Sequence, residues 1–293
     1  MTAVTVLVLG LNWPVMTFGV ATIPPLWLTS MRLLGAGVGI AALLWVRGGL
    51  RRPPRSDYAV VGSVAIVRLA LVFGLVTSAL LFVPPGRASL LTHTAGLWAA
   101  PLGAWFLSER LTRGRAIALL VGIAGIALLM EPWTLRITDR ATIGYAMLVT
   151  AAIATAASTV HMRGHRWASS PMALMPWQLL IAGCLSAVAA VSVAGAPRLA
   201  WDLREIGVVA YQVVLAGGVG VWGTITISRA MPATSTGIVM MAVPVIGVAS
   251  SVLAVGELLT PATLAGMGVV LAAIAANVLA DRRASTAVSA AAA

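Results

Sequence analysis

Residues 58–82 read YAVVGSVAIVRLALVFGLVTSALLF, a continuous apolar stretch whose one charged side chain is Arg68. A helix needs about 20 apolar residues to cross the hydrocarbon core of a bilayer, so this stretch is predicted to be a transmembrane helix. Nine further apolar segments surround it, separated by prolines, glycines or charged residues: 3–20, 26–46, 88–107, 114–130, 142–160, 171–193, 205–228, 234–254 and 262–280. The sequence therefore predicts an all-α polytopic membrane protein with ten transmembrane helices.

The composition supports a membrane protein and excludes several other classes. Of the 293 residues, 60% are hydrophobic and 9% are charged, and the mean hydropathy is +1.00. A soluble domain carries about 25% charged residues, so a soluble globular protein is excluded. The single cysteine, Cys184, excludes a disulfide scaffold. The net charge of +11 lies in scattered arginines with no basic face, and we expect no nucleic-acid partner.

The distribution of arginines predicts the orientation of the chain, because cytoplasmic loops carry an excess of basic residues. With the N-terminus inside, the cytoplasmic loops hold Arg47, Arg51, Arg52, Arg55, Arg110, Arg113, Arg115, Arg163, Arg166, Arg229, Arg282 and Arg283. The outer loops hold only Arg87, Arg136, Arg140, Arg198 and Arg204. Both termini are therefore predicted to be cytoplasmic (N-in/C-in), and we expect a multi-pass protein of the bacterial inner membrane.

The two halves of the chain resemble each other. Glu109-Arg110-Leu111-Thr112 matches Glu257-Leu258-Leu259-Thr260, and Pro84 precedes the first as Pro232 precedes the second. We therefore predict a first five-helix repeat over 1–131, a second over 142–281, and a disordered Ala/Ser-rich tail over 284–293. Because five spans are an odd number, the second repeat must insert upside down, so that Glu109 faces the cytoplasm and Glu257 faces outward.

Inverted repeats indicate a transporter that works by alternating access. Two units related by an axis in the membrane plane can exchange conformations, which opens a central site first to one side and then to the other. A duplicated membrane scaffold without transport is the alternative.

The paired Glu-x-Leu-Thr elements and Asn12-Trp13-Pro14-Val15-Met16 in the first span together resemble the EamA-type members of the drug/metabolite transporter superfamily. The resemblance covers residues 1–283. It implies ten helices in two inverted five-helix repeats, with spans one to four and six to nine around a central cavity. Many EamA proteins have a lysine shortly after the Asn-Trp-Pro element, whereas this chain has Thr17.

Within that family the chain is most similar to YddG-type exporters of aromatic amino acids. The resemblance implies export, or facilitated diffusion, of aromatic or bulky apolar amino acids and similar metabolites. Another cargo, such as a drug or a nucleotide sugar, is the first alternative, and an intramembrane enzyme is the second. No Gly-x-Ser-x-Gly, His-Glu-x-x-His or P-loop motif is present, so we expect no enzyme, no cofactor and no metal site.

Polar side chains within spans are candidates for the substrate site, because they are costly in lipid unless they face a cavity or a partner. The Asn12 amide can bind a carboxylate or an ammonium group, or form an interhelical hydrogen bond instead. His93 can bind substrate or sense protons, or be satisfied by the hydroxyls of Thr92 and Thr94. Gln178 stands at the repeat position of Arg32, which suits a gate or a cavity wall. Arg32 and Arg68 are expected to pair with carbonyls or to snorkel.

Tryptophans inside the spans can stack on an aromatic substrate or attract its ammonium group. We predict Trp13, Trp98, Trp177 and Trp222 as substrate-binding residues, with helix packing as the alternative for each. No acidic residue is predicted to lie mid-membrane, which favours facilitated diffusion or coupling through a histidine over a carboxylate proton carrier. The expected partners are the lipid bilayer and a small amino-acid substrate, and the chain is expected to be monomeric.

Overall fold

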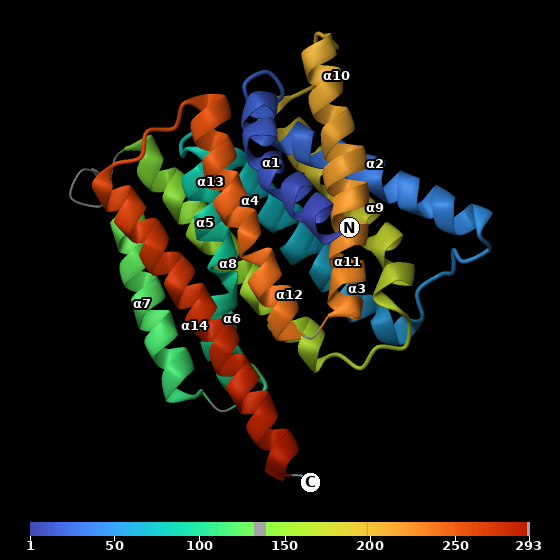
Figure 1. Ribbon diagram of the computed structural model, residues 1–293. Coiled ribbons are helices and arrows are strands. Elements are labelled where there is room, and N and C mark those ends of the chain that lie inside the picture. The colour runs from blue at the N-terminus through green and yellow to red at the C-terminus, as the bar shows by residue number, and fades with distance from the viewer. Residues whose placement is uncertain (110, 132–138, 198, 232, 292–293) are drawn as a thin grey trace.

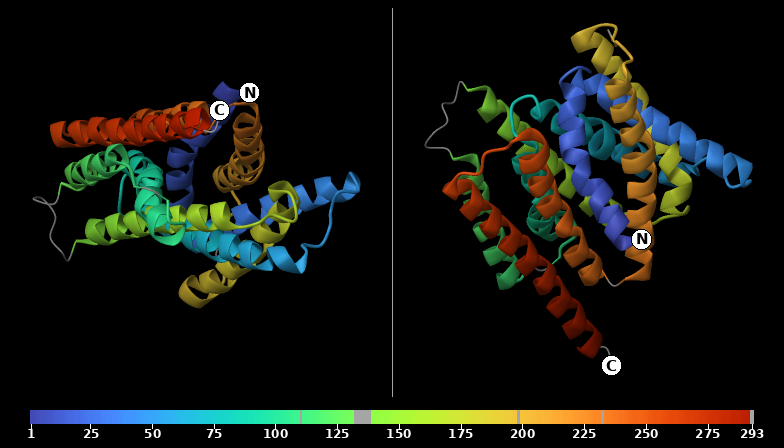
Figure 2. Two further views of the ribbon diagram at one scale, coloured as in Figure 1. Left: turned by 90° about the horizontal axis from the view of Figure 1, so that it is seen from below. Right: turned by 45° about the horizontal axis from the view of Figure 1, so that its top comes forward.

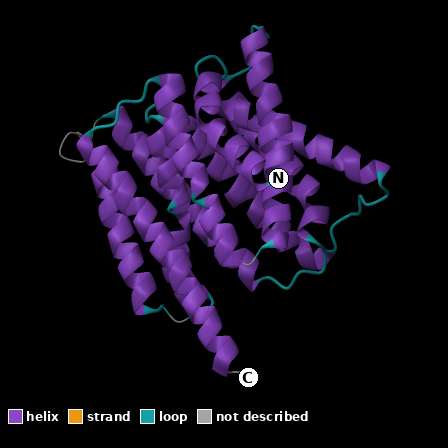
Figure 3. Ribbon diagram, in the orientation of Figure 1, coloured by secondary structure: helices purple, strands orange, loops and turns teal. Residues whose placement is uncertain are grey.

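A computed structural model describes residues 1–293 except 110, 132–138, 198, 232 and 292–293. Over the described residues the chain is helical, with loops and turns but no strand (Figure 3). Eight of the helical stretches are long and apolar enough to span a membrane: Thr2–Val20, Pro25–Val46, Arg55–Ala79, Arg113–Met130, Arg140–Gly164, Pro171–Ala194, Leu203–Thr224 and Pro261–Ala280. Each coincides with a predicted span, and the fold is an all-helical membrane bundle.

The first half of the bundle contains the helices α1 (Thr2–Val20), α2 (Pro25–Val46), α3 (Tyr58–Ser63), α4 (Val72–Ala79), α5 (Pro85–His93), α6 (Ala95–Phe106) and α7 (Arg113–Met130). The second half contains α8 (Arg140–Gly164), α9 (Pro171–Ala194), α10 (Leu203–Ala210), α11 (Val221–Ala230), α12 (Ala233–Met240), α13 (Ala242–Val255) and α14 (Pro261–Ala291). A short 3₁₀ turn, η1 (Arg55–Asp57), precedes α3.

The fourth and ninth predicted spans are each divided into two shorter helices. The first break lies at Thr94, where the hydroxyl donates to the carbonyl of Leu91 at 2.6 Å and tight three-residue hydrogen bonds replace the α-helical ones. The second lies at Met241, just before Pro244, which has no N–H for the carbonyl of Met240. None of the four resulting helices, α5, α6, α12 and α13, has the length of a complete span, so the predicted count of ten stays a prediction.

The third and eighth predicted spans share another irregularity. Each contains a π-helical segment, η2 (Val64–Leu71) between α3 and α4 and η3 (Tyr211–Gly220) between α10 and α11. π-Helical segments are rare in proteins as a whole, but the ones that occur often lie at functional sites. The irregular segments thus recur at corresponding places in the two halves.

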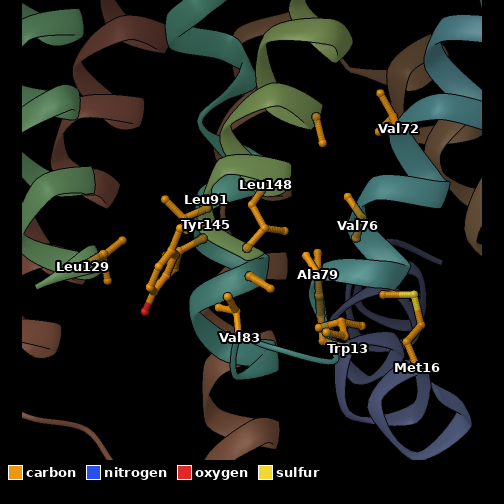
Figure 4. Packing of buried hydrophobic residues seen from close by; sticks show 14 of the residues in the cluster. Trp13, Met16, Val72, Val76, Ala79, Val83, Leu91, Leu129, Tyr145 and Leu148 are labelled. Atoms are coloured by element: carbon orange, nitrogen blue, oxygen red, sulfur yellow. The ribbon is translucent and has the colours of Figure 1, made fainter. Parts of the chain in front are cut away.

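Helices from opposite halves pack together in pairs. The most extensive pairs are α2 with α9, α7 with α14, and α1 with α13, and Figure 2 shows α14 alongside α7 in both views. Glycines permit these approaches: a Cβ at Gly183 of α9 would lie 2.7 Å from the Leu34 side chain of α2. The main buried cluster includes Trp13 and Met16 of α1, Val76 of α4 and Leu148 of α8 (Figure 4).

The last helix, α14, is described as far as Ala291. The predicted bounds of the two repeats and the predicted tail over 284–293 stay predictions. The predicted orientation of the termini stays a prediction.

Candidate functional site

One face of α1 carries the centre of the candidate site. Val8, Asn12 and Met16 follow one another at intervals of four residues and therefore share a face of the helix. The hydroxyl of Tyr211, from the π-helical segment η3, donates to the carbonyl of Val8 at 2.7 Å. Asn12 is 6% exposed, and its side-chain oxygen has no hydrogen-bond partner among the described residues.

Arg32 of α2 reaches the same face of α1. Its Nη1 lies 3.7 Å from the sulfur of Met16, and its guanidinium lies 4.5 Å from the centre of the Phe73 ring of α4. Within the described part of the chain, no acidic side chain forms an ion pair with Arg32. The site thus holds a positive charge with a sulfur and an aromatic face as neighbours.

His93 and Trp13 form the adjoining part of the site. Their ring centroids are 6.4 Å apart, and the Nδ1 of His93 lies 2.7 Å from the carbonyl oxygen of Ser89. A Cβ at Gly247 of α13 would lie 3.0 Å from the Trp13 indole and 2.6 Å from the hydroxyl of Ser89. The structure therefore brings Trp13 and His93 together where α1, α5 and α13 meet, next to the break at Thr94.

Of the other four predicted site residues, Trp98 packs against the same buried cluster as Trp13, and the other three are not part of that cluster. The indole N–H of Trp98 has no described partner. Trp177 donates its indole N–H to the carbonyl of Arg51 at 2.9 Å and packs beside Val60 and Val64, in a different cluster from Trp13. Gln178 is buried on α9, and Trp222 is 54% exposed. No described hydrogen bond joins these residues to Asn12.

Sequence reasoning missed two members of the site, Arg32 and Tyr211. A charge in the middle of span 26–46 was a signal, but its environment depends on three other helices. Arg68, by contrast, behaves as expected, because its Nη1 donates to the hydroxyl of Thr159 at 3.1 Å and lies 3.5 Å from the carbonyl of Thr155.

At one end of the bundle, Glu257 caps the start of α5. Its Oε2 accepts the backbone N–H of Gly86 at 2.8 Å and its Oε1 accepts that of Arg87 at 3.3 Å. Pro84 and Pro85 begin this helix without a side-chain cap, so a carboxylate from the end of α13 satisfies the free N–H groups. Burial raises the pKa of Glu257 in spite of these two hydrogen bonds.

Arg87 extends this contact to three further helices. It donates to the hydroxyls of Tyr145 at 3.1 Å and Thr263 at 2.8 Å, and it lies 3.9 Å from Glu131 at the end of α7. Glu131 also accepts hydrogen bonds from Thr260 and Thr263. The hydrogen bond from Thr260, followed by that from Thr263 and the charge of Arg87, lowers the pKa of Glu131.

The corresponding glutamate at the opposite end, Glu109, makes different contacts. It lies just after α6, and it forms an ion pair with Arg163 of α8 at 3.2 Å and another with Arg115 of α7 at 4.0 Å. Both glutamates follow a residue in the left-handed conformation, Ser108 or Gly256. Figure 1 places the α13–α14 and α6–α7 connections at opposite ends of the bundle.

A bundle of apolar spans that holds a half-buried cation, a buried amide and aromatic rings between its helices is consistent with a multi-pass membrane transport protein. The chain belongs to the EamA-like transporter family, whose model matches residues 1–131 and again residues 142–279. Its family members and relatives are transporters rather than enzymes.

Three relatives and one solved structure are similar over most of their length. The chain is 28% identical to a probable amino-acid metabolite efflux pump of Salmonella typhimurium, over 94% of this chain and 93% of that protein. It is 26% identical to a protein of the same description in Escherichia coli, over 93% and 92%. An uncharacterized transporter of Bacillus subtilis, YoaV, is 20% identical over 82% of both. A crystal structure aligns with a TM-score of 0.64 over 96% of both chains at 23% identity, which shows the shared fold alone. These bacterial relatives are consistent with the inner membrane.

Proposed function

We propose that this protein exports amino acids, or facilitates their diffusion, with a preference for aromatic and bulky apolar side chains. Two relatives described as probable amino-acid metabolite efflux pumps support this substrate class. The observation in the structure that carries the proposal is the group of Asn12, Trp13 and His93 beside a broken helix, where polar and aromatic side chains from different spans meet.

The substrate site of the proposal is centred on these three residues and extends to Trp98. An indole or phenyl ring can pack against Trp13 and His93, while the amide of Asn12 can bind the polar end of the substrate. Trp177, Gln178 and Trp222 remain predicted members of the site. They lie in the second half, and a change of conformation is needed to bring them toward Asn12.

Alternating access is the proposed mechanism. The two halves have matching π-helical segments, matching breaks and matching terminal glutamates. In the present state Glu257 holds the ends of α13 and α5 together, whereas Glu109 is paired with Arg163 and Arg115. If the halves exchange conformations, Glu109 takes over the equivalent role at the start of α12 and Glu257 releases α5. The bundle then opens at the opposite end.

The proposal can be tested by uptake into liposomes that contain the purified protein. Labelled tryptophan, phenylalanine and threonine, with a sugar as control, are offered with and without a pH gradient. We expect saturable entry of the amino acids that Asn12→Ala and His93→Ala weaken. Entry that continues after the gradient collapses supports facilitated diffusion, and strict dependence on the gradient refutes it. If folded protein admits no amino acid, the proposed substrate class is wrong.

A further inference from the structure

Arg32 is the least compensated charge in the described part of the site. A guanidinium is always charged, and its removal from water costs free energy unless an anion or several acceptors replace the water. Its contacts are the sulfur of Met16, a weak acceptor, and the face of the Phe73 ring. These do not replace a carboxylate, and the described ion pairs of the chain lie elsewhere.

Arg68, the second arginine within a span, provides the comparison. It donates to the hydroxyl of Thr159 and is directed at the carbonyl of Thr155, both on α8, so oxygen atoms of the protein already solvate its charge. Arg32 has no such oxygen partner among the described residues. The difference indicates that Arg32 is kept available for a ligand, whereas Arg68 joins two helices.

The acceptors on the neighbouring face of α1 are suited to the opposite charge. Asn12 lies one turn before Met16, which Arg32 contacts, and one turn after Val8, whose carbonyl Tyr211 engages. Asn12 therefore shares a face of α1 with Val8 and Met16. Its Oδ1 has no hydrogen-bond partner among the described residues, and it is an acceptor for an ammonium group.

We infer that Arg32 binds the carboxylate of an α-amino acid, while Asn12 Oδ1 accepts from its ammonium group. This inference rests on the proposed function and makes it more specific. The ligand class is a zwitterion with both charged groups on one carbon, and its apolar side chain lies toward Trp13 and His93. An amine that lacks the carboxylate, or an amide in its place, leaves the guanidinium without an anionic partner and binds more weakly.

The test is competition against labelled tryptophan in a scintillation proximity assay with the purified full-length protein. Unlabelled tryptophan, tryptophanamide and tryptamine are the competitors. A hydrogen-bonded charge contributes enough that we expect the two compounds without a carboxylate to compete about 10- to 100-fold more weakly. In Arg32→Gln the affinity for tryptophan falls toward that for tryptophanamide, and the affinity for tryptophanamide is nearly unchanged. Labelled tryptophanamide is therefore the probe for this variant and reports that its site is folded.

Arg68→Gln is the matched control, because it also removes an arginine from a span. It retains the preference for tryptophan over tryptophanamide, even where it lowers the amount of active protein. An Arg32→Gln variant that keeps the full preference overturns the inference and leaves the proposed function intact. Equal competition by tryptophan and tryptophanamide in the wild-type protein does the same. A wild-type protein that binds no amino acid overturns both.

Discussion

The two ends of the bundle hold equivalent glutamates in different ways. Glu257 is 8% exposed and caps α5 through two backbone N–H groups, within a network that joins five helices. Glu109 makes ion pairs with Arg163 and Arg115, and the Arg163 side chain is 44% exposed. Two halves of similar sequence are thus in different local states. The contacts of each glutamate therefore depend on the conformation of its half of the bundle as well as on the local sequence.

Removing the two carboxylates one at a time is the strongest test of this difference. Glu257→Ala leaves the backbone N–H groups of Gly86 and Arg87 without a buried acceptor, which we expect to cost about 1–3 kcal/mol of stability. It should also shift the bundle toward its other conformation and slow transport by about 5- to 100-fold, since each 1.4 kcal/mol is a factor of ten. Glu109→Ala should affect stability much less, because a surface ion pair contributes about 0–1 kcal/mol.

Thermal unfolding in detergent and liposome uptake measure the two effects. Glu257→Gln, which keeps an acceptor oxygen, is the control and should recover part of both. Equal losses of stability in Glu257→Ala and Glu109→Ala would mean that the two ends are equivalent in solution.

The arginines at the two ends allow a second comparison. Arg87 donates to Tyr145 and Thr263 and faces Glu131, with a side chain that is 15% exposed. We expect Arg87→Gln to cost about 1–2 kcal/mol, because charge-assisted hydrogen bonds are lost at a partly buried place. Arg163→Gln should cost less than about 1 kcal/mol and respond to salt. Melting curves at low and high salt separate them, and a salt-sensitive Arg87 contribution would contradict the buried network.

The pH dependence of stability should arise at the Glu257 end. The folded pKa of Glu257 is raised, so it favours folding fully below the unfolded value near 4.5, and this contribution is lost as pH rises through the folded pKa. The folded pKa of Glu131 is lowered, so its contribution is present above 4.5 and lost only at lower pH. As the pH falls from neutral toward 4.5, the melting temperature should therefore rise.

Glu257→Gln should abolish this rise, and Glu131→Gln should leave it in place at a lower overall stability. The measurement is a series of melting curves from pH 5 to 7 for both variants. A slope that persists in Glu257→Gln would assign the titration to another group.

The amino-acid sequence predicts the parts of this fold that depend on composition and spacing. Apolar runs such as 58–82 predict the spans, and the paired elements at Glu109 and Glu257 predict the correspondence between the halves. The breaks at Thr94 and Met241 have local signals, the polar run Thr92-His93-Thr94 and Pro244, but hydropathy alone predicts one span through each of them.

The candidate site was predictable only in part. Asn12, Trp13 and His93 stand out in the sequence as polar or aromatic residues within spans. The structure places the ring of His93 beside that of Trp13, the residue that follows Asn12. The importance of Arg32 depends on the absence of an acidic or oxygen partner among the described residues, and no local pattern in the sequence reports that. Trp177 has the same residue type as Trp13, but its neighbours come from the α3 and α9 region.

The α2–α9 pair is a place where the two ends are alike, and it gives the smallest expected effects. Trp27, near the start of α2, donates its indole N–H to the carbonyl of Gly195 after α9, at 3.0 Å. Trp177 of α9 donates to the carbonyl of Arg51 after α2, at 2.9 Å. Trp27→Phe and Trp177→Phe should each cost about 0.5–1.5 kcal/mol of stability, and the two costs should be similar.

Binding of labelled tryptophan, measured beside the melting temperatures, tests the role first predicted for Trp177. If Trp177→Phe weakens binding while Trp27→Phe does not, Trp177 contacts substrate in a conformation other than the present one. If both variants lose only stability, the two indole hydrogen bonds have the same structural role, which is to join α2 to α9. The asymmetry of the molecule is then confined to the ends of α5 and α13.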